Sequence, residues 1–489
     1  VFRQIIFDII SSNFLVVNSI EPKKQKRKQH FDFPLFSLFE AKKSQGCKLV
    51  RNSKCLVFPE HRWFWKYNED MKRTDRDILS IDLKSFYASV ECIDRDLDPF
   101  TTPLVVADEE RGDGTIVLAA SPFIKEKYKV KSRCRLYEVD KNIEGLIIAR
   151  PRMQRYLGVS AIINSIYLDF VSEDDLYVYS IDESFLDVTC YLNMHKDTPM
   201  TYAKKIIETI RDKTGLTVTA GIGKNLFMAK ACMDIEAKHK KDFLSSWDYK
   251  DIPEHLWNVS PLSKMWGIGS RLEKRLNRMG FFSVGDIAVS DPDYLKKELG
   301  VIGEEIYYHA NGYDDALIQD TYVSMNRSMS VGQVLLRDYY PHEVPVLIND
   351  MSFELSERML QEKVVANNFY FFLGYKDHTG TGKRVCFYTP TDSAMKISQK
   401  ITEIYLEEMN RKNVLYREIS IVACDVFSVD EYQTSLFEDH ESDVRLRRLE
   451  MTMMKIRNDY GPRKCLPCSA LCLDSTFLTR ADQIGGHHK

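Results

Sequence analysis

Short apolar runs that end in acidic residues are the clearest pattern along this chain. One run, residues 78–81, leads into Asp82, and another, residues 176–179, leads into the string that contains Asp182 and Glu183. Runs of this length, bounded by polar residues, are typical of buried strands. If these two strands are neighbours, the three carboxylates converge at one edge of a sheet.

The pattern between the two acidic strings and just beyond them alternates between strand and helix. Residues 115–130 predict a strand and then a helix with Pro122 in its first turn. Farther on, the periodicity predicts a helix over 202–212, a strand over 216–223 and a helix over 224–238.

A second region, residues 320–428, has its own regular pattern. It predicts strands at 328–337, 368–375, 383–389 and 418–427, with helices at 343–362 and 393–409. The resulting order, β-α-β-β-α-β, indicates a separate α+β unit.

Three clustered carboxylates suggest phosphoryl chemistry. Such groups repel one another unless a cation lies between them, and hard oxygen ligands favour Mg²⁺. Two ions of this kind can stabilise the attacking and leaving oxygens of a nucleotidyl transfer. Any one of the carboxylates, taken alone, is better explained as a solvated carboxylate in a loop. The aromatic pair Phe86-Tyr87 could lie under the sugar of a nucleotide and exclude a 2′-hydroxyl, or could simply be core residues at a helix start.

The acidic strings resemble the catalytic motifs of Y-family DNA polymerases, the low-fidelity lesion-bypass enzymes. The similarity is greatest to the UmuC-like branch with the ImpB/MucB/SamB proteins, and it extends over residues 67–437. It implies an α+β multidomain, right-handed polymerase. The expected parts are a palm (71–110 and 151–240), small fingers (111–150), a helix-hairpin-helix thumb (241–314) and a βαββαβ little finger (320–428).

The resemblance also implies roles for single residues. Two Mg²⁺ ions would be bound by Asp82, Asp182 and Glu183 with the Leu83 carbonyl, and Tyr87 would be the steric gate with Phe86 beside it. The incoming triphosphate would lie near Phe123 and pair with Lys127 and Lys238, or with Lys240 or Lys230 in place of Lys238. Many relatives carry an arginine where Glu126 stands, and a carboxylate cannot hold a phosphate.

DNA contacts are expected from local basic patches, because the net charge of the whole chain is only −3. Residues 262–276 resemble a helix-hairpin-helix, whose glycines allow a close approach to a phosphate. From Lys264 to Arg278 there are five basic residues and one acidic residue. The predicted DNA contacts are Lys264, Gly267, Gly269, Arg271, Arg327, Lys383 and Arg384.

The two ends of the chain differ from this pattern. Residues 1–70 match nothing in the family and carry a basic run at 23–28; they are either a DNA-binding arm or translation from upstream of Met71, which we favour. The predicted tail, 429–489, contains Gln433, Ser435, Leu436 and Phe437, which resemble a sliding-clamp-binding peptide. Unpaired surface thiols or a frayed tail explain Cys465, Cys468 and Cys472 better than a zinc site does.

Composition narrows the location and the class of protein. Eleven scattered cysteines in a chain of 489 residues favour reduced thiols in a cytosolic protein, and no run reaches the length of a membrane span. Together with the family resemblance, which implies a bacterial, nucleoid-associated monomer, this leads us to expect a cytoplasmic protein. Its partners would be primer-template DNA, dNTP, the clamp and SOS accessory proteins.

Two other classes of function compete with the polymerase hypothesis. A non-catalytic accessory protein would bind DNA and clamp without needing three acidic residues. A nucleotide cyclase uses similar metal chemistry on a palm but needs no hairpin-helix thumb and no clamp peptide. The expected activity is template-directed, error-prone translesion DNA synthesis.

Overall fold

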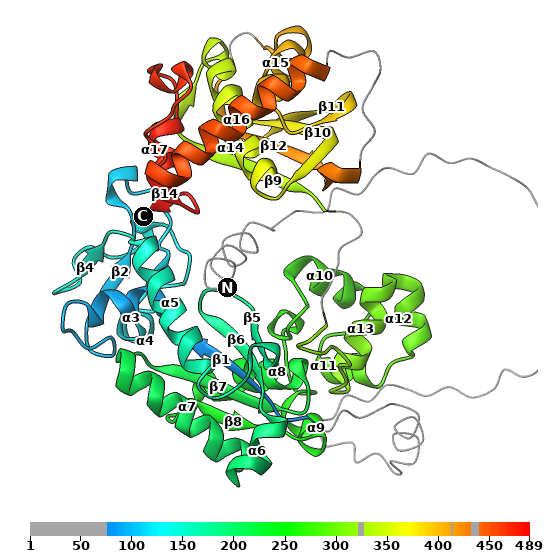
Figure 1. Ribbon diagram of the computed structural model, residues 1–489. Coiled ribbons are helices and arrows are strands. Elements are labelled where there is room, and N and C mark those ends of the chain that lie inside the picture. Colours follow the sequence, from blue (N-terminus) through cyan, green and yellow to red (C-terminus); the bar gives the residue numbers. More distant parts are fainter. Residues whose placement is uncertain (1–75, 321–326, 412–413, 432–439) are drawn as a thin grey trace, which may run out of the picture. The chain divides into compact units, whose positions relative to one another are not determined.

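A five-stranded sheet holds the two acidic strings. The computed structural model describes residues 76–320, 327–411, 414–431 and 440–489 (Figure 1). The strand order in this sheet is β5-β6-β1-β7-β8. The strands are β1 (Ile78–Leu83), β5 (Leu176–Val178), β6 (Glu183–Asp187), β7 (Val218–Gly223) and β8 (Leu244–Ser246).

Alternation along β1 sends side chains to two different layers of helices. Leu79 and Ile81 are buried in the cluster that also holds residues of α5 (Met153–Tyr167) and α7 (Pro199–Thr214). On the opposite face, Ile78 packs with residues of α8 (Leu226–Ile235), and the Ser80 hydroxyl contacts Met233. Because side chains alternate along a strand, Asp82 lies on the α8 face as well.

Two glycines of β7 allow α8 to lie against the sheet. A Cβ added at Gly221 would lie 2.4 Å from the Ala229 carbonyl oxygen and the Met233 nitrogen. A Cβ added at Gly223 would lie 2.3 Å from the Ala229 nitrogen. Only glycine fits such a close approach, so these two positions bring α8 close to the acidic strand ends.

The prediction of a buried strand at 176–179 was wrong about burial. That run forms β5 at the edge of the sheet, and Tyr177 remains 45% exposed. The strand with the buried pattern is β6, which begins at Glu183. Asp182 therefore lies in the turn between β5 and β6, and Glu183 is the first residue of β6.

A smaller sheet and the helix beside it cover the region predicted as fingers (111–150) and begin before it, at Leu104. The strand order is β3-β2-β4. As the sequence indicated, a short strand leads into a helix with Pro122 in its first turn, and the Ser121 hydroxyl caps that helix at the Ile124 nitrogen. The elements are β2 (Leu104–Val106), β3 (Ala119–Ala120), β4 (Ile147–Ala149) and α4 (Pro122–Lys127).

Short helices surround a separate core in the region predicted as the thumb. Leu262, Met265 and Ile268 are buried in this core, next to Trp247. Gly267 has a φ of 90°, which places it in the left-handed region that favours glycine. The helices here are α9 (Ile252–His255), α10 (Ser270–Arg278), α11 (Val284–Ala288), α12 (Pro292–Leu299) and α13 (Val301–Ala310). Two more helices, α3 (Phe86–Ile93) and α6 (Thr189–His195), lie in the regions predicted as palm.

The predicted β-α-β-β-α-β order of the next unit is confirmed. Its sheet has the order β11-β10-β12-β9, and helices pack on one face of it (Figure 1). The strands are β9 (Met329–Tyr339), β10 (Val364–Tyr375), β11 (Gly380–Thr391) and β12 (Tyr416–Cys424), with β13 (Phe427–Ser428) paired to β10. The helices are α14 (Val344–Gln361) and α15 (Ala394–Ile404), which a π turn extends to Met409.

The end of the chain is folded, so the expectation of a frayed tail was wrong. The long helix α16 (His440–Tyr460) packs against α14, and the elements after it are α17 (Phe477–Ala481), β14 (Gln483–Ile484) and β15 (His487–His488). The Asp350 carboxylate accepts hydrogen bonds from the Ser475 hydroxyl (2.9 Å) and the Thr476 nitrogen (2.8 Å). These contacts join residues more than one hundred positions apart, which explains why the local pattern did not indicate them.

Candidate active site

The three carboxylates do converge, as the strand pattern predicted. Strands β1 and β6 are antiparallel neighbours, and Asp82 lies directly opposite Glu183. The Leu83 nitrogen donates a hydrogen bond to the Asp182 carbonyl oxygen (2.8 Å), which places Asp182 at the same end of the pair. The Ser180 hydroxyl donates to the Asp182 carboxylate (2.7 Å) and orients that side chain.

Two lysines lie against these carboxylates. Lys230 Nζ is 2.5 Å from Glu183 Oε1, and Lys238 Nζ is 3.0 Å from Asp82 Oδ2. Both lysines also reach Asp234, at 3.1 Å for Lys230 and 2.8 Å for Lys238. Sequence reasoning overlooked Asp234, although its i, i+4 spacing from both lysines on a helix was a usable signal.

Burial shapes the electrostatics of the site. It raises the pKa of Asp82 and the pKa of Glu183, because a carboxylate loses solvation when it is removed from water. Burial alone would lower the pKa of Lys238, but the carboxylates of Asp82 and Asp234 outweigh it and raise that pKa. The site therefore gathers buried negative charge that needs nearby cations. Such a set of hard oxygen donors fits Mg²⁺.

A cavity of about 890 Å³ opens beside Asp82 and Lys238. Lys84, Ser85 and Lys125 line it, and Lys125 Nζ lies 2.9 Å from the Ser85 hydroxyl. The Lys84 ammonium lies 4.0 Å from the centroid of the Phe243 ring. The cavity is also lined by Phe100, Pro122, Glu126, Thr219, His239, Lys240, Lys241 and Phe243. With five lysines at its wall, it suits a polyphosphate.

The fingers helix presents different residues to this cavity than the family resemblance implied. Lys127 is exposed, with its ammonium 5.0 Å from the centroid of the Phe123 ring, and neither residue lines the cavity. Lys125, two residues before Lys127 on the same helix, does line it. Glu126 lines the cavity too. The carboxylate at position 126 cannot hold a phosphate, but the neighbouring Lys125 supplies positive charge to the same cavity.

Tyr87 is fixed in place beside the acidic cluster. Its ring stacks on the Tyr156 ring with a centroid separation of 4.4 Å and packs 5.5 Å from Phe86. Burial, followed by the charge of Asp182, raises the pKa of Tyr87 to about 12. The hydroxyl therefore stays protonated close to the carboxylates, where a gating side chain would have to lie.

The hairpin-helix region turns its predicted contact residues outward. Lys264, Gly267, Gly269 and Arg271 are all exposed, whereas Met265 and Ile268 between them are buried. Gly269 precedes the first turn of α10, whose leading N–H groups have no acceptor within the helix. This surface can contact a phosphate backbone without regard to sequence.

The three basic residues predicted in the βαββαβ unit differ in position. Arg384 is exposed on β11, two residues before the exposed Cys386, on the face opposite the buried Val385. Lys383 has the same parity as Val385, and its ammonium pairs with Glu408 after α15. Arg327 lies 3.8 Å from Glu362. The open face of this sheet thus offers Arg384, whereas Lys383 is engaged on the helix side.

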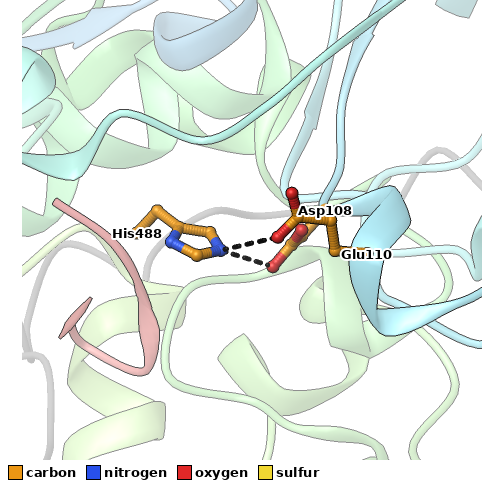
Figure 2. Close-up of side chains that lie close together, drawn as sticks. All are labelled: Asp108, Glu110 and His488. Atoms are coloured by element: carbon orange, nitrogen blue, oxygen red, sulfur yellow. Dashed lines mark ion pairs between the residues drawn. The ribbon is translucent and has the colours of Figure 1, made fainter. Parts of the chain in front are cut away.

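A second group of possible metal ligands lies away from this site. Asp108, Glu110 and His488 come together, as Figure 2 shows, but two arginines neutralise them. Arg150 Nη2 lies 2.9 Å from Glu110 and 2.8 Å from His488 Nε2, and Arg111 Nε lies 3.0 Å from Asp108. The cluster is an ion-pair network that connects the C-terminal hairpin to the residues that follow β2. It includes none of Cys465, Cys468 and Cys472.

Some predicted features lie outside the described residues. They are the extension at 1–70 and the clamp peptide with Gln433, Ser435, Leu436 and Phe437. Within the described ranges, none of the helices is both long enough and apolar enough to span a bilayer.

Models of one protein family match the segment with the acidic cluster, the hairpin-helix region and the C-terminal part of the chain. The impB/mucB/samB family model matches residues 81–234, its helix-hairpin-helix motif matches 249–281, and its C-terminal domain matches 326–458. The last match extends beyond residue 428 and takes in most of α16.

Two relatives from Bacillus subtilis strain 168 are similar over most of their length. A protein named as a UV-damage repair protein, UvrX, is 35% identical over 84% of this chain and 97% of its own. A protein named DNA polymerase IV 2 is 30% identical over 85% of this chain and 99% of its own. Among solved structures, a Y-family DNA polymerase chimera of Dbh and Dpo4 matches with a TM-score of 0.58 at 19% identity, over 72% of this chain and 99% of that chain.

Proposed function

The chain belongs to the impB/mucB/samB family of Y-family translesion DNA polymerases, and we propose that Asp82, Asp182 and Glu183 are its catalytic carboxylates. The observation that carries this proposal is the direct pairing of Asp82 with Glu183 on adjacent strands, with Asp182 hydrogen-bonded to the same strand end. This pairing brings the three acidic side chains to one strand end, where they can share cations.

These residues fit two Mg²⁺ ions. Asp82, Asp182 and Glu183, with the Leu83 carbonyl, would hold them, and the ions would supply activation of the primer 3′-hydroxyl and neutralisation of the leaving pyrophosphate. The chain itself already places two ammonium groups against the same carboxylates, at 2.5 Å and 3.0 Å. Positive charge is therefore accommodated at these oxygens.

The lysine-lined cavity is the proposed site of the incoming dNTP. Lys238 and Lys125 are the best-placed triphosphate ligands, because both line the cavity next to Asp82. Tyr87 would pack against the deoxyribose and exclude a 2′-hydroxyl. The family resemblance implied that Lys127 and Phe123 of the fingers contact the triphosphate. We now assign this contact to Lys125.

DNA would be held by the thumb and little finger. Lys264, Gly267, Gly269 and Arg271 contact the backbone of the duplex, and Arg384 contributes from the open face of the little-finger sheet. We further propose that Gln433, Ser435, Leu436 and Phe437 bind a sliding clamp. The enzyme would act as a monomer in the bacterial cytoplasm, at the nucleoid. SOS accessory proteins would be its further partners.

Single-nucleotide incorporation on an undamaged primer-template tests the proposal. The Asp182→Asn variant should lose at least about 10²-fold in turnover, because it removes an anionic metal ligand. Asp212→Asn, which removes an exposed carboxylate of α7, is the matched control and should remain active.

A wild-type protein that binds primer-template but incorporates nothing would support a non-catalytic accessory role instead. Product formed from a nucleotide without any primer would support a cyclase. Equal turnover by Asp182→Asn and the wild type would remove Asp182 from the reaction.

A further inference from the structure

An alternating chain of charges crosses the active site. In order, it consists of Glu183, Lys230, Asp234, Lys238 and Asp82. The successive nitrogen–oxygen distances are 2.5, 3.1, 2.8 and 3.0 Å. Both ends of the chain are metal ligands in the proposed function, on which this inference rests. Its centre, Asp234, has no part in that function.

Asp234 divides its two oxygens between the two lysines. Its Oδ2 pairs with Lys230 one turn earlier in α8, and its Oδ1 pairs with Lys238, four residues farther along. Lys230 and Asp234 are one turn apart on α8 and share a face, whereas Lys238 lies in the 3-10 turn (Ala237–His239) that follows α8 and pairs with Asp234 from there. Without the carboxylate between them, the two ammonium groups would repel each other, since like charges repel.

Lys230 is a permanent part of the site. Its side chain is only 8% exposed, and among the described residues no other group donates a hydrogen bond to Glu183 Oε1. The close approach of α8 at Gly221 and Gly223 fixes the helix that carries it. Glu183 Oε1 is therefore taken by Lys230, which leaves Oε2 for a cation.

Lys238 is in a different situation. Its side chain is 33% exposed and lines the lysine-rich cavity. It has two carboxylate partners, Asp82 and Asp234, at nearly equal distances. It can release the first and keep the second without crossing the site.

We propose that Asp234 is a positioning residue that retains Lys238 at the cavity when a divalent cation replaces its ammonium group at Asp82. The exchange frees Asp82 for the cation and leaves Lys238 beside the space for a triphosphate. Without Asp234, Asp82 becomes the remaining carboxylate partner of Lys238 in this chain of charges. The ammonium group then competes more strongly with the cation.

A double-mutant cycle on cation binding tests this directly. Mn²⁺ is titrated into the full-length protein without DNA or nucleotide, and the free ion is measured by electron paramagnetic resonance. The proteins are the wild type, Asp234→Asn, Lys238→Met and the double variant. Thermal melting confirms that each variant is folded.

The inference predicts a non-additive result. Asp234→Asn should weaken Mn²⁺ binding about threefold to tenfold in the wild-type background, within the usual range for coupled neighbours. Lys238→Met should tighten binding, and in that background Asp234→Asn should have little further effect. If Asp234→Asn weakens Mn²⁺ binding equally in the wild-type and Lys238→Met backgrounds, Asp234 acts only through its own charge, and the inference is overturned. The absence of any effect of Asp234→Asn would overturn it as well.

A further variant keeps this test separate from the proposed function. Asp182→Asn should abolish the tight Mn²⁺ site in any background. If Asp182→Asn binds Mn²⁺ as tightly as the wild type does, the carboxylate cluster is not the metal site, and the proposed function fails. If Asp182→Asn abolishes binding but the cycle is additive, the metal site stands and only the role of Asp234 is wrong.

Discussion

The rings of Tyr87 and Tyr156 stack almost in parallel, with an interplanar angle of 13° and centroids 4.4 Å apart. The Tyr156 hydroxyl in turn donates to the carboxylate of Glu91 (2.7 Å), which is fully buried and is also held by Arg152 (2.9 Å). The proposed gate is therefore supported from behind by a rigid, charge-anchored aromatic side chain. A rigid gate discriminates better than a mobile one, because it cannot move aside for an extra hydroxyl.

Replacing Tyr87 with alanine should admit ribonucleotides. The loss of the ring removes the clash with a 2′-hydroxyl, which is worth about 1–3 kcal/mol of discrimination. The ratio of kcat/KM for dCTP and CTP measures it. Tyr87→Phe keeps the ring and should preserve the ratio, and an unchanged ratio in Tyr87→Ala would place the gate elsewhere.

Weakening the support behind the gate should have a smaller effect in the same direction. Tyr156→Leu removes the stacking partner but leaves Tyr87 present. The dNTP preference should fall less than in Tyr87→Ala. A preference equal to that of the wild type would show that Tyr87 does not depend on this stack.

Gly221 should tolerate no side chain. A methyl group there would collide with the backbone of α8 at 2.4 Å, and such overpacking costs about 1–3 kcal/mol. Gly221→Ala should lower the melting temperature and reduce turnover, because α8 carries Lys230 and Asp234. Gly114→Ala, where a Cβ meets nothing within 4 Å, is the control and should behave as the wild type.

The little-finger sheet should bind DNA through Arg384 and not through Lys383. Arg384→Ala should weaken primer-template binding and reduce the dependence of log K on log salt by about one unit. Lys383 pairs with Glu408, so Lys383→Ala should leave that slope unchanged. Fluorescence anisotropy over a salt series distinguishes the two. The reverse order would show that DNA meets the helix-covered face.

The docking of α16 should depend on pH through Glu450. This carboxyl is buried, accepts from the Ser393 hydroxyl (3.0 Å) and the Met395 nitrogen (3.3 Å), and burial raises its pKa to about 7. A raised carboxyl pKa means that the folded state binds the proton more tightly. The contribution to stability is thus full below the ordinary carboxyl pKa and is lost as the pH rises through about 7.

Glu450→Gln should remove this loss. The variant and the wild type should be equally stable below the ordinary carboxyl pKa, near pH 4, and the variant should be more stable by about 1–3 kcal/mol at pH 8. Melting curves across that range measure the difference. A constant gap between the two proteins at all pH values would contradict the role of Glu450.

The acidic strand ends could be predicted from the sequence because they depend on local patterns. An apolar run before Asp82 specifies a buried strand, and the βαββαβ order follows from periodicity in the same way, whereas the helix-hairpin-helix was expected from its resemblance to a known motif. Lys125 could not be separated from Lys127, because both lie on the polar part of a six-residue helix and only packing decides which one faces the cavity.

The folded C-terminal segment was missed for a different physical reason. Most residues of helix α16 are polar or charged, and its buried Glu450 accepts hydrogen bonds from Ser393 and from the start of α15. Asp350 and Ser475 likewise interact across more than one hundred residues. Such polar pairs leave no mark on local hydrophobicity.

The central claim is that this chain copies damaged DNA by means of Asp82, Asp182 and Glu183. Primer extension across a template abasic site, with Mg²⁺ and all four dNTPs, tests it most directly. The wild type should extend past the lesion, and the Asp182→Ala, Glu183→Ala double variant should bind the same primer-template yet add no nucleotide. Bypass by the double variant, or extension by the wild type that always ends at the lesion, would contradict the account.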